Sequence, residues 1–168
     1  GKSIHAELYN GGHDPHAYLG AQLALKSDHE LTTAFTGAAG STPMEQYEEF
    51  VRWGSGTPEQ KAFYKHFRTF AKPVGLGFPG GLGPATMVNF AKATYGVEIT
   101  EKEAHKMREF WRQTYPEMRA FSEWVNGQVD LKNAGGDDGK YEYRTPMGMH
   151  RRGASYCATS NGMAMQSP

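Results

Sequence analysis

Residues 57–83 read TPEQKAFYKHFRTFAKPVGLGFPGGLG, a stretch that begins with a helix cap and ends in a run of glycines. Thr57, with Pro58 next to it and Gln60 three positions on, is a capping box that predicts the start of a helix. Apolar side chains then recur at spacings of three and four, namely Phe63, Phe67, Phe70 and Val74. This spacing predicts a helix through Lys72 with one face in a hydrophobic core.

A second stripe of the same helix carries two cations. Arg68, Lys72 and Leu76 follow one another at intervals of four, so the guanidinium and the ammonium should lie side by side. Pro73 removes one backbone donor and crowds the preceding turn, which predicts a kink or an early helix end there. The glycines and the proline of residues 75–83 favour turns and a close approach of the backbone to another group.

Helices are also predicted in the rest of the chain. Caps or first-turn prolines mark helix starts at Asp14, Thr42, Pro84, Thr100 and Pro116. Residues 141–152 alternate around a Pro-Met-Gly turn, which is typical of a β-hairpin, and a final helix is expected near Ser155. The expected fold class is therefore mainly α, with a short hairpin near the C-terminus.

The charge is balanced overall but uneven along the chain. The formal net charge is zero, which argues against a protein whose whole surface binds nucleic acid. Residues 61–97, however, hold basic side chains and no acidic ones; these are Lys61, Lys65, Arg68, Lys72 and Lys92. A single basic face is therefore expected, although charged runs on helices are often only solvated surface.

The composition also bears on location and on metals. No apolar run approaches the length needed to cross a bilayer, so no membrane partner is expected. Cys157 is the only cysteine and cannot form an internal disulfide, which favours a reducing cytoplasm. The histidines show no zinc-ligand spacing, so no metal site is predicted within the chain.

Three basic side chains have the chemistry to hold a triphosphate. The guanidinium of Arg68 can grip phosphate oxygens bidentately, and the ammonium of Lys72 adds a compact charge. His16 lies in the first turn of a predicted helix, where backbone amides favour anions. The glycine run is not a P-loop, because it ends Gly83-Pro84-Ala85 instead of Gly-Lys-Ser/Thr.

Several blocks occur in a fixed order along nearly the whole chain. They are Asp14-Pro15-His16, Arg68 to Lys72, Gly77 to Gly83, Tyr95-Gly96-Val97, Trp111 with Tyr115-Pro116-Glu117-Met118, and Tyr156-Cys157-Ala158. Their order resembles the fingers and the adjoining palm segment of family A (DNA polymerase I-like) DNA polymerases. The Phe-Pro-Gly-Gly form of the glycine run resembles the phage-type branch of that family.

The resemblance implies a role for five residues at the incoming deoxynucleotide (dNTP). His16, Arg68 and Lys72 would contact its phosphates; Arg68 and Lys72 would be catalytic, with Lys72 assisting as charge develops on the leaving pyrophosphate. Leu76 stands where the family has an aromatic that packs on the sugar, and Gly80 where many members have a tyrosine near the template base. Both positions depart from the family pattern.

The resemblance also implies partners and a cofactor. Asn161 and Gln166 resemble the polar pair that contacts the minor groove of primer-template DNA, but they are five residues apart here instead of four. Two palm aspartates that bind Mg²⁺ are expected outside this chain, in the remaining palm and thumb segments of the polymerase. The location would be the cytoplasm, that of a host cell if the protein is phage-encoded.

The implied layout has four parts. Residues 1–25 would begin the fingers, 26–60 would be a branch-specific helical insertion, 61–131 would carry the nucleotide-binding helix, and 132–168 a loop, the hairpin and the start of a palm helix. The expected function is template-directed DNA synthesis by the parent enzyme.

Two alternatives stay open. One is a catalytically inactive DNA-binding or accessory module that keeps the fingers fold. The other is a plain helical structural domain, in which Arg68 and Lys72 would pair with Glu48 or Glu49 instead of facing an open cleft.

Overall fold

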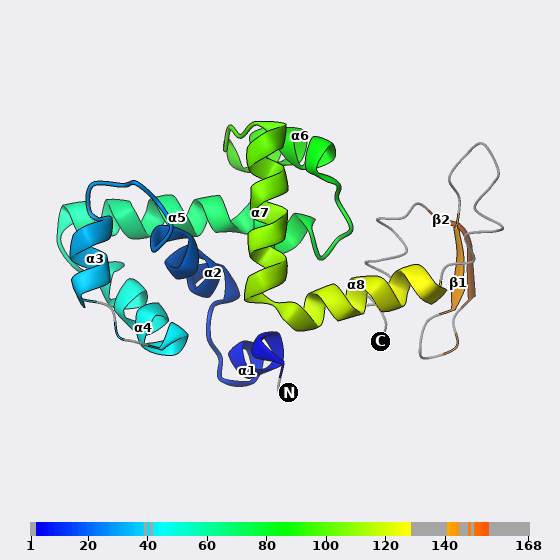
Figure 1. The fold of residues 1–168 in the computed structure, drawn as a ribbon, viewed down its shortest axis with the longest axis horizontal. Coiled ribbons are helices and arrows are strands. Elements are labelled where there is room, and N and C mark those ends of the chain that lie inside the picture. Colours follow the sequence, from blue (N-terminus) through cyan, green and yellow to red (C-terminus); the bar gives the residue numbers. More distant parts are fainter. Residues whose placement is uncertain are drawn as a thin grey trace.

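The computed structural model describes residues 3–38, 40, 42–128, 141–144, 148 and 150–154. Within these ranges the protein is mainly helical, as the sequence predicts, with one antiparallel hairpin (Figure 1). The helices are α1 (Ile4–Asn10), α2 (Pro15–Ala24), α3 (Thr32–Ala38), α4 (Pro43–Trp53), α5 (Pro58–Gly77), α6 (Pro84–Tyr95), α7 (Glu101–Thr114) and α8 (Pro116–Gln128). The strands are β1 (Tyr141–Arg144) and β2 (His150–Ala154), which confirms the predicted hairpin.

All six predicted helix starts are confirmed, four of them with side-chain cap hydrogen bonds. Asp14 accepts from the first amides of α2, and Thr42, Thr57 and Thr100 each form a complete capping box with the third residue of their helix. Gly96 follows α6 with φ of +65°, a left-handed conformation that glycine adopts without steric cost. Local sequence thus decides where α2, α4, α5 and α7 begin.

Helix α5 continues past Pro73, so the alternative of an early helix end there is wrong. Pro73 is buried together with Val74 and Gly77, and packing of this last turn against α6 offsets the lost backbone hydrogen bond. A Cβ added at Gly77 would collide with the side chain of Met87 on α6. The close backbone approach predicted for the glycine run therefore occurs between α5 and α6.

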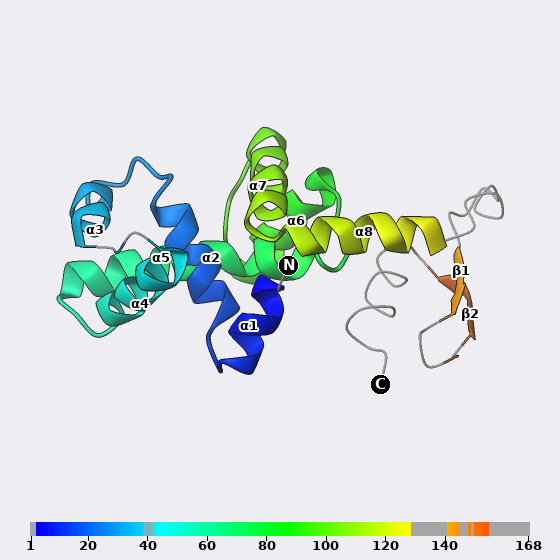
Figure 2. The same ribbon diagram turned by 60° about the horizontal axis from the view of Figure 1, so that its bottom comes forward.

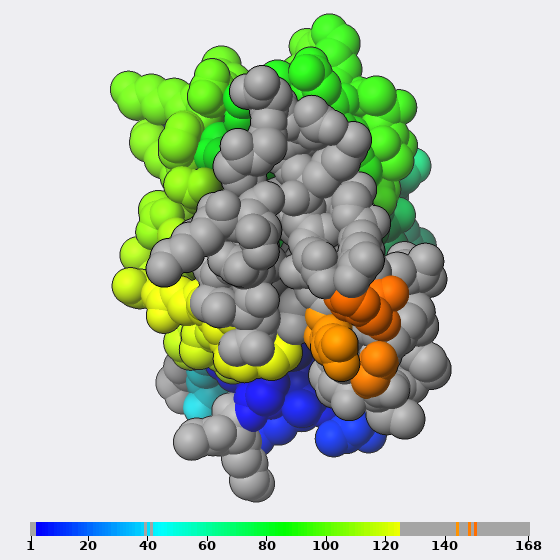
Figure 3. Space-filling model, turned by 90° about the vertical axis from the view of Figure 1, so that its right-hand side faces the viewer, coloured from blue at the N-terminus to red at the C-terminus, as the bar shows by residue number. Residues whose placement is uncertain are grey.

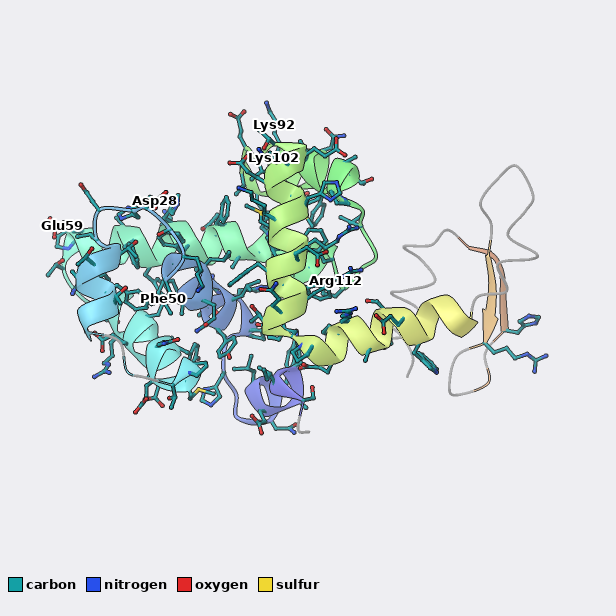
Figure 4. The ribbon with its side chains drawn as sticks, in the orientation of Figure 1. Asp28, Phe50, Glu59, Lys92, Lys102 and Arg112 are labelled. Carbon is teal, nitrogen blue, oxygen red and sulfur yellow. The ribbon has the colours of Figure 1, made fainter. Side chains whose placement is uncertain are left out.

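One end of the helical body is an aromatic core. Phe35 of α3, Trp53 of α4 and Phe63 of α5 have ring centroids 5.1 to 5.5 Å apart, and all three are buried. Phe50 of α4 lies beside them, between the helices (Figure 4). Helices α3 and α4, which occupy the predicted insertion at residues 26–60, therefore share a core with α5.

The other end is formed by α6 and α7, which pack on each other and on the C-terminal part of α5. Trp111 and Tyr115 at the end of α7 are almost completely buried, and the Phe78 ring lies 6.0 Å from that of Trp111. Both ribbon views show α5 running between the two ends, with α2 packed along its middle (Figures 1 and 2).

The remaining sequence predictions concern membrane crossing and the C-terminal residues. Among the described helices, none combines the length and the apolar character that a bilayer crossing requires. The final helix expected near Ser155 and the candidate DNA-binding residues Asn161 and Gln166 lie outside the described residues.

Candidate functional site

A hydrogen-bonded ion pair between residues far apart in the sequence lies at the centre of the site. Nε of Arg68, in the middle of α5, donates to Oδ2 of Asp14 at 2.7 Å. The other carboxylate oxygen of Asp14 accepts from the amides of His16, at 2.8 Å, and Ala17, at 3.2 Å. Asp14 therefore caps α2 and holds the Arg68 guanidinium at the same time.

The Asp14 carboxylate is held in its charged form. Burial would raise the pKa of Asp14, but the hydrogen bonds from Arg68 and from the amides of Ala17 and His16 outweigh burial and lower it. Because Asp14 already accepts from these amides, an anion at this end of α2 would be contacted by side chains. The sequence predicts that backbone amides at the start of α2 help His16 to bind an anion. Two of these amides, those of His16 and Ala17, already donate to the Asp14 carboxylate.

The N-terminal turn of α2 lies along α5 from Arg68 to Gly75. A Cβ added at Gly75 would lie 3.1 Å from Nδ1 of His16, so the imidazole packs directly on the α5 backbone. Burial lowers the pKa of His16; the carboxylate of Asp14 opposes this, and the charges of Arg68 and Lys72 lower it further. His16, Arg68 and Lys72 are therefore brought within electrostatic reach of one another.

Close contact between α2 and α5 has a second cause at Gly20. An ideal Cβ there would lie 3.2 Å from the backbone nitrogen of Arg68 and 3.2 Å from the Phe50 ring. The absence of a side chain at Gly20 lets the two helices approach closely at Arg68. This contact fixes where Arg68 stands relative to the α2 N-terminus.

The structural-domain alternative expects Arg68 and Lys72 to pair with Glu48 or Glu49. Arg68 pairs with Asp14 instead. Glu49 bonds to Arg52 and to the indole nitrogen of Trp53. Within the described part of the chain, no carboxylate lies within ion-pair distance of Lys72.

An apolar pocket of about 330 Å³ is lined by His16 and by Leu76, which follows Lys72 by one turn of α5. From α2 and α5 it is lined by His16, Leu19, Gly75 and Leu76, with Pro79 beyond the helix end. From the other side it is lined by His5, Tyr9, Tyr115 and Met118. Leu76 is 38% exposed and reaches this pocket, whereas Gly80 is buried and is not part of the pocket lining.

The pocket wall opposite α5 is held in place by hydrogen bonds at Glu117, the second residue of α8. Oε1 of Glu117 accepts from the amide of His5 at 2.9 Å and from the hydroxyl of Ser3 at 3.2 Å. Figure 3 shows α8 on the face that also carries α1 below it and α7 above it. These bonds position His5 and Tyr9 against the end of α7.

Two buried imidazole nitrogens at this pocket lack partners among the described residues. They are Nε2 of His5 and Nδ1 of His16. Burial lowers the pKa of His5; the carboxylate of Glu117 opposes this, and His16 adds to the lowering. Leaving buried polar atoms without partners costs free energy, and the neutral imidazole lowers this cost.

Sequence reasoning singled out His16, Arg68, Lys72 and Leu76 but missed the other side of the pocket. His5 and Tyr9 belong to a short helix with no strong sequence signal. The ion pair of Asp14 with Arg68 also has no sequence signature. A capping aspartate has the same sequence pattern whether or not its second carboxylate oxygen binds a partner.

Among the residues described here, no three His, Cys, Asp or Glu side chains lie close enough together to bind one metal ion. Comparison with protein-family models gives no match, and comparison with curated proteins gives no significant match.

Proposed function

We propose that this chain is the nucleotide-binding part of a template-directed DNA polymerase. The observation that carries the proposal is the Asp14–Arg68 ion pair, which joins α5 to the start of α2, where His16 feels the charges of Arg68 and Lys72 and lines an apolar pocket. This combination fits the two ends of a nucleoside triphosphate, with phosphates over the cations and the sugar and base against apolar surface.

Each basic residue has a distinct task in the proposal. Arg68, oriented through Nε by Asp14, presents its remaining guanidinium nitrogens to phosphate oxygens. Lys72 neutralises charge that develops on the leaving pyrophosphate, the type of preorganised electrostatic stabilisation that accelerates phosphoryl transfer. His16 is held beside them on the α5 backbone. Leu76, on the pocket wall, would contact the sugar.

The remaining parts of the reaction are proposed to come from outside the chain. Mg²⁺ would be bound by two aspartates of the adjoining polymerase segments. Primer-template DNA would contact residues that include Asn161 and Gln166. A phage origin and a cytoplasmic location belong to the same proposal.

The test is the affinity of the purified chain for a dNTP, measured by calorimetry at low salt. Removing Lys72 (Lys72→Ala) should weaken binding by about tenfold, because a hydrogen bond to a charged group contributes roughly 1.5 kcal/mol or more. Lys102→Ala is the matched control, since Lys102 is an exposed lysine at the N-terminal end of α7, the opposite end of that helix from the pocket residue Tyr115 (Figure 4). Equal affinities for the two variants would overturn the assignment of Lys72.

The same titration should depend on pH through His16. The pKa of His16 is lowered in the free chain, and a bound triphosphate would raise it, so binding takes up protons. Affinity should therefore increase as the pH falls from 7.5 towards 6. In His16→Gln this proton uptake is removed, and protonation of the terminal phosphate of the ligand weakens binding, so the increase should disappear; an identical pH dependence would remove His16 from the site.

A further inference from the structure

The cations of α5 extend beyond the two residues assigned to the triphosphate. At 100° per residue, Lys61, Lys65, Arg68 and Lys72 fall within a sector of about 60° on one side of the helix. The acidic residue of the first turn, Glu59, lies roughly opposite Arg68. One face of α5 is therefore uniformly basic over nearly its whole length.

This basic face is not neutralised by the described part of the chain. Lys61 and Lys65 are exposed, and no carboxylate among the described residues lies within ion-pair distance of either. Cations elsewhere on the helices are often paired within their own segment, for example Arg52 with Glu49, Lys92 with Glu98 and Arg119 with Glu123. The charge of Lys61 and Lys65 is thus available to an external anion.

The order of groups along α5 gives this anion a position, and here the argument rests on the proposed function. With the sugar at Leu76, the phosphates run towards the helix N-terminus over Lys72 and Arg68. At 1.5 Å per residue, Lys65 lies about 4.5 Å beyond Arg68 along the axis and Lys61 about 10.5 Å beyond it. The terminal phosphate would therefore point at Lys65.

We infer that Lys65 and Lys61 form a subsite for a linear polyphosphate anion beyond the γ-phosphate of a bound triphosphate. The anion is either the additional phosphate of a longer nucleoside 5′-polyphosphate or a free inorganic polyphosphate. Both present the same chain of phosphate oxygens, which ammonium groups bind as point charges. The subsite makes the site selective for phosphate-chain length.

The experiment compares the affinities of the chain for dATP and for deoxyadenosine 5′-tetraphosphate in one buffer. The tetraphosphate should bind about fivefold tighter, as expected for one added exposed ion pair. In the variant Lys61→Ala/Lys65→Ala the ratio of the two affinities should fall from about five to about one. Lys102→Ala/Lys106→Ala removes the same charge from α7 and should keep the preference.

Three outcomes separate the inference from the function on which it rests. A tetraphosphate preference that survives in Lys61→Ala/Lys65→Ala, or that is lost equally in the α7 control, overturns the subsite while dATP binding stands. Loss of Lys72-dependent dATP binding overturns the proposed function itself. Titration with inorganic tripolyphosphate distinguishes the two candidate anions. Tripolyphosphate binding that depends on Lys61 and Lys65 supports a free inorganic polyphosphate. If tripolyphosphate does not bind but wild type prefers the tetraphosphate, the anion is the additional phosphate of a nucleoside polyphosphate.

Discussion

In the proposed complete polymerase, replacing Lys72 by alanine should lower the rate of nucleotide incorporation by a factor of about 100 or more. Lys72 lies four residues from Arg68 on the same side of α5, and no carboxylate of the described residues competes for its ammonium. Its charge is therefore free to act on the reacting phosphates. Affinity for primer-template DNA should stay nearly unchanged, because the effect concerns the nucleotide.

Single-turnover incorporation of one nucleotide measures this effect directly. Lys72→Arg keeps the positive charge and should lose less activity than Lys72→Ala, although the guanidinium geometry differs from that of an ammonium. Lys102→Ala controls for the loss of a lysine. A rate for Lys72→Ala within about threefold of wild type would exclude Lys72 from the reaction.

The second large effect concerns stability. Replacing Phe63 by alanine should reduce the free energy of unfolding by about 3–5 kcal/mol, the usual cost of removing a buried aromatic side chain. The Phe63 side chain is only 1% exposed. Its ring has neighbours on three other segments, namely His29, Phe35, Phe50 and Trp53, and also contacts Phe67 of α5 itself. The cavity left by Phe63→Ala would therefore weaken the packing of α3 and α4 on α5 together.

Urea unfolding followed by circular dichroism measures the change. Val51→Ala is the control, because Val51 lies on α4 beside this core but is 39% exposed and should change stability by no more than about 0.5 kcal/mol. If Phe63→Ala costs less than about 1 kcal/mol, α3 and α4 do not share a core with α5 as described here.

Local rules predicted most of the helix starts because caps act over four residues. The pairs Thr42 with Glu45 and Thr100 with Glu103 satisfy each other's backbone donors without help from the rest of the fold. Helix α3, with the sequence TTAFTGA, has no such signal and weak helix formers. Its Phe35 is fully buried, so tertiary packing and not local preference accounts for this helix.

The end of α5 shows a similar limit. Pro73 and the following glycines predict a break on local grounds, yet the helix continues for another turn because α6 packs on Gly77. The predicted apolar stripe is largely correct, with Phe63, Phe67 and Val74 buried and Phe70 partly buried. Periodicity is preserved through a proline, whereas the exact helix end depends on a partner helix.

For the site, the sequence predicted the basic residues and Leu76, but not the residues that hold them in place or form the opposite pocket wall. The spacing of Arg68 and Lys72 is local and could be read directly. The bond from Arg68 to Asp14 joins positions 54 residues apart and has no sequence signature. The same is true of the pocket wall formed by His5 and Tyr115, which depends on how α1 and α7 meet.

Primer extension tests the central proposal most directly. The purified chain is mixed with magnesium, primed template and all four dNTPs, alone and together with polymerase segments that supply the two metal-binding aspartates. We expect no extension by the chain alone, template-directed extension when these segments are added, and loss of that extension with Lys72→Ala. No extension in the complete mixture, or extension that is insensitive to Lys72→Ala, would contradict the proposal that this chain binds the incoming nucleotide of a DNA polymerase.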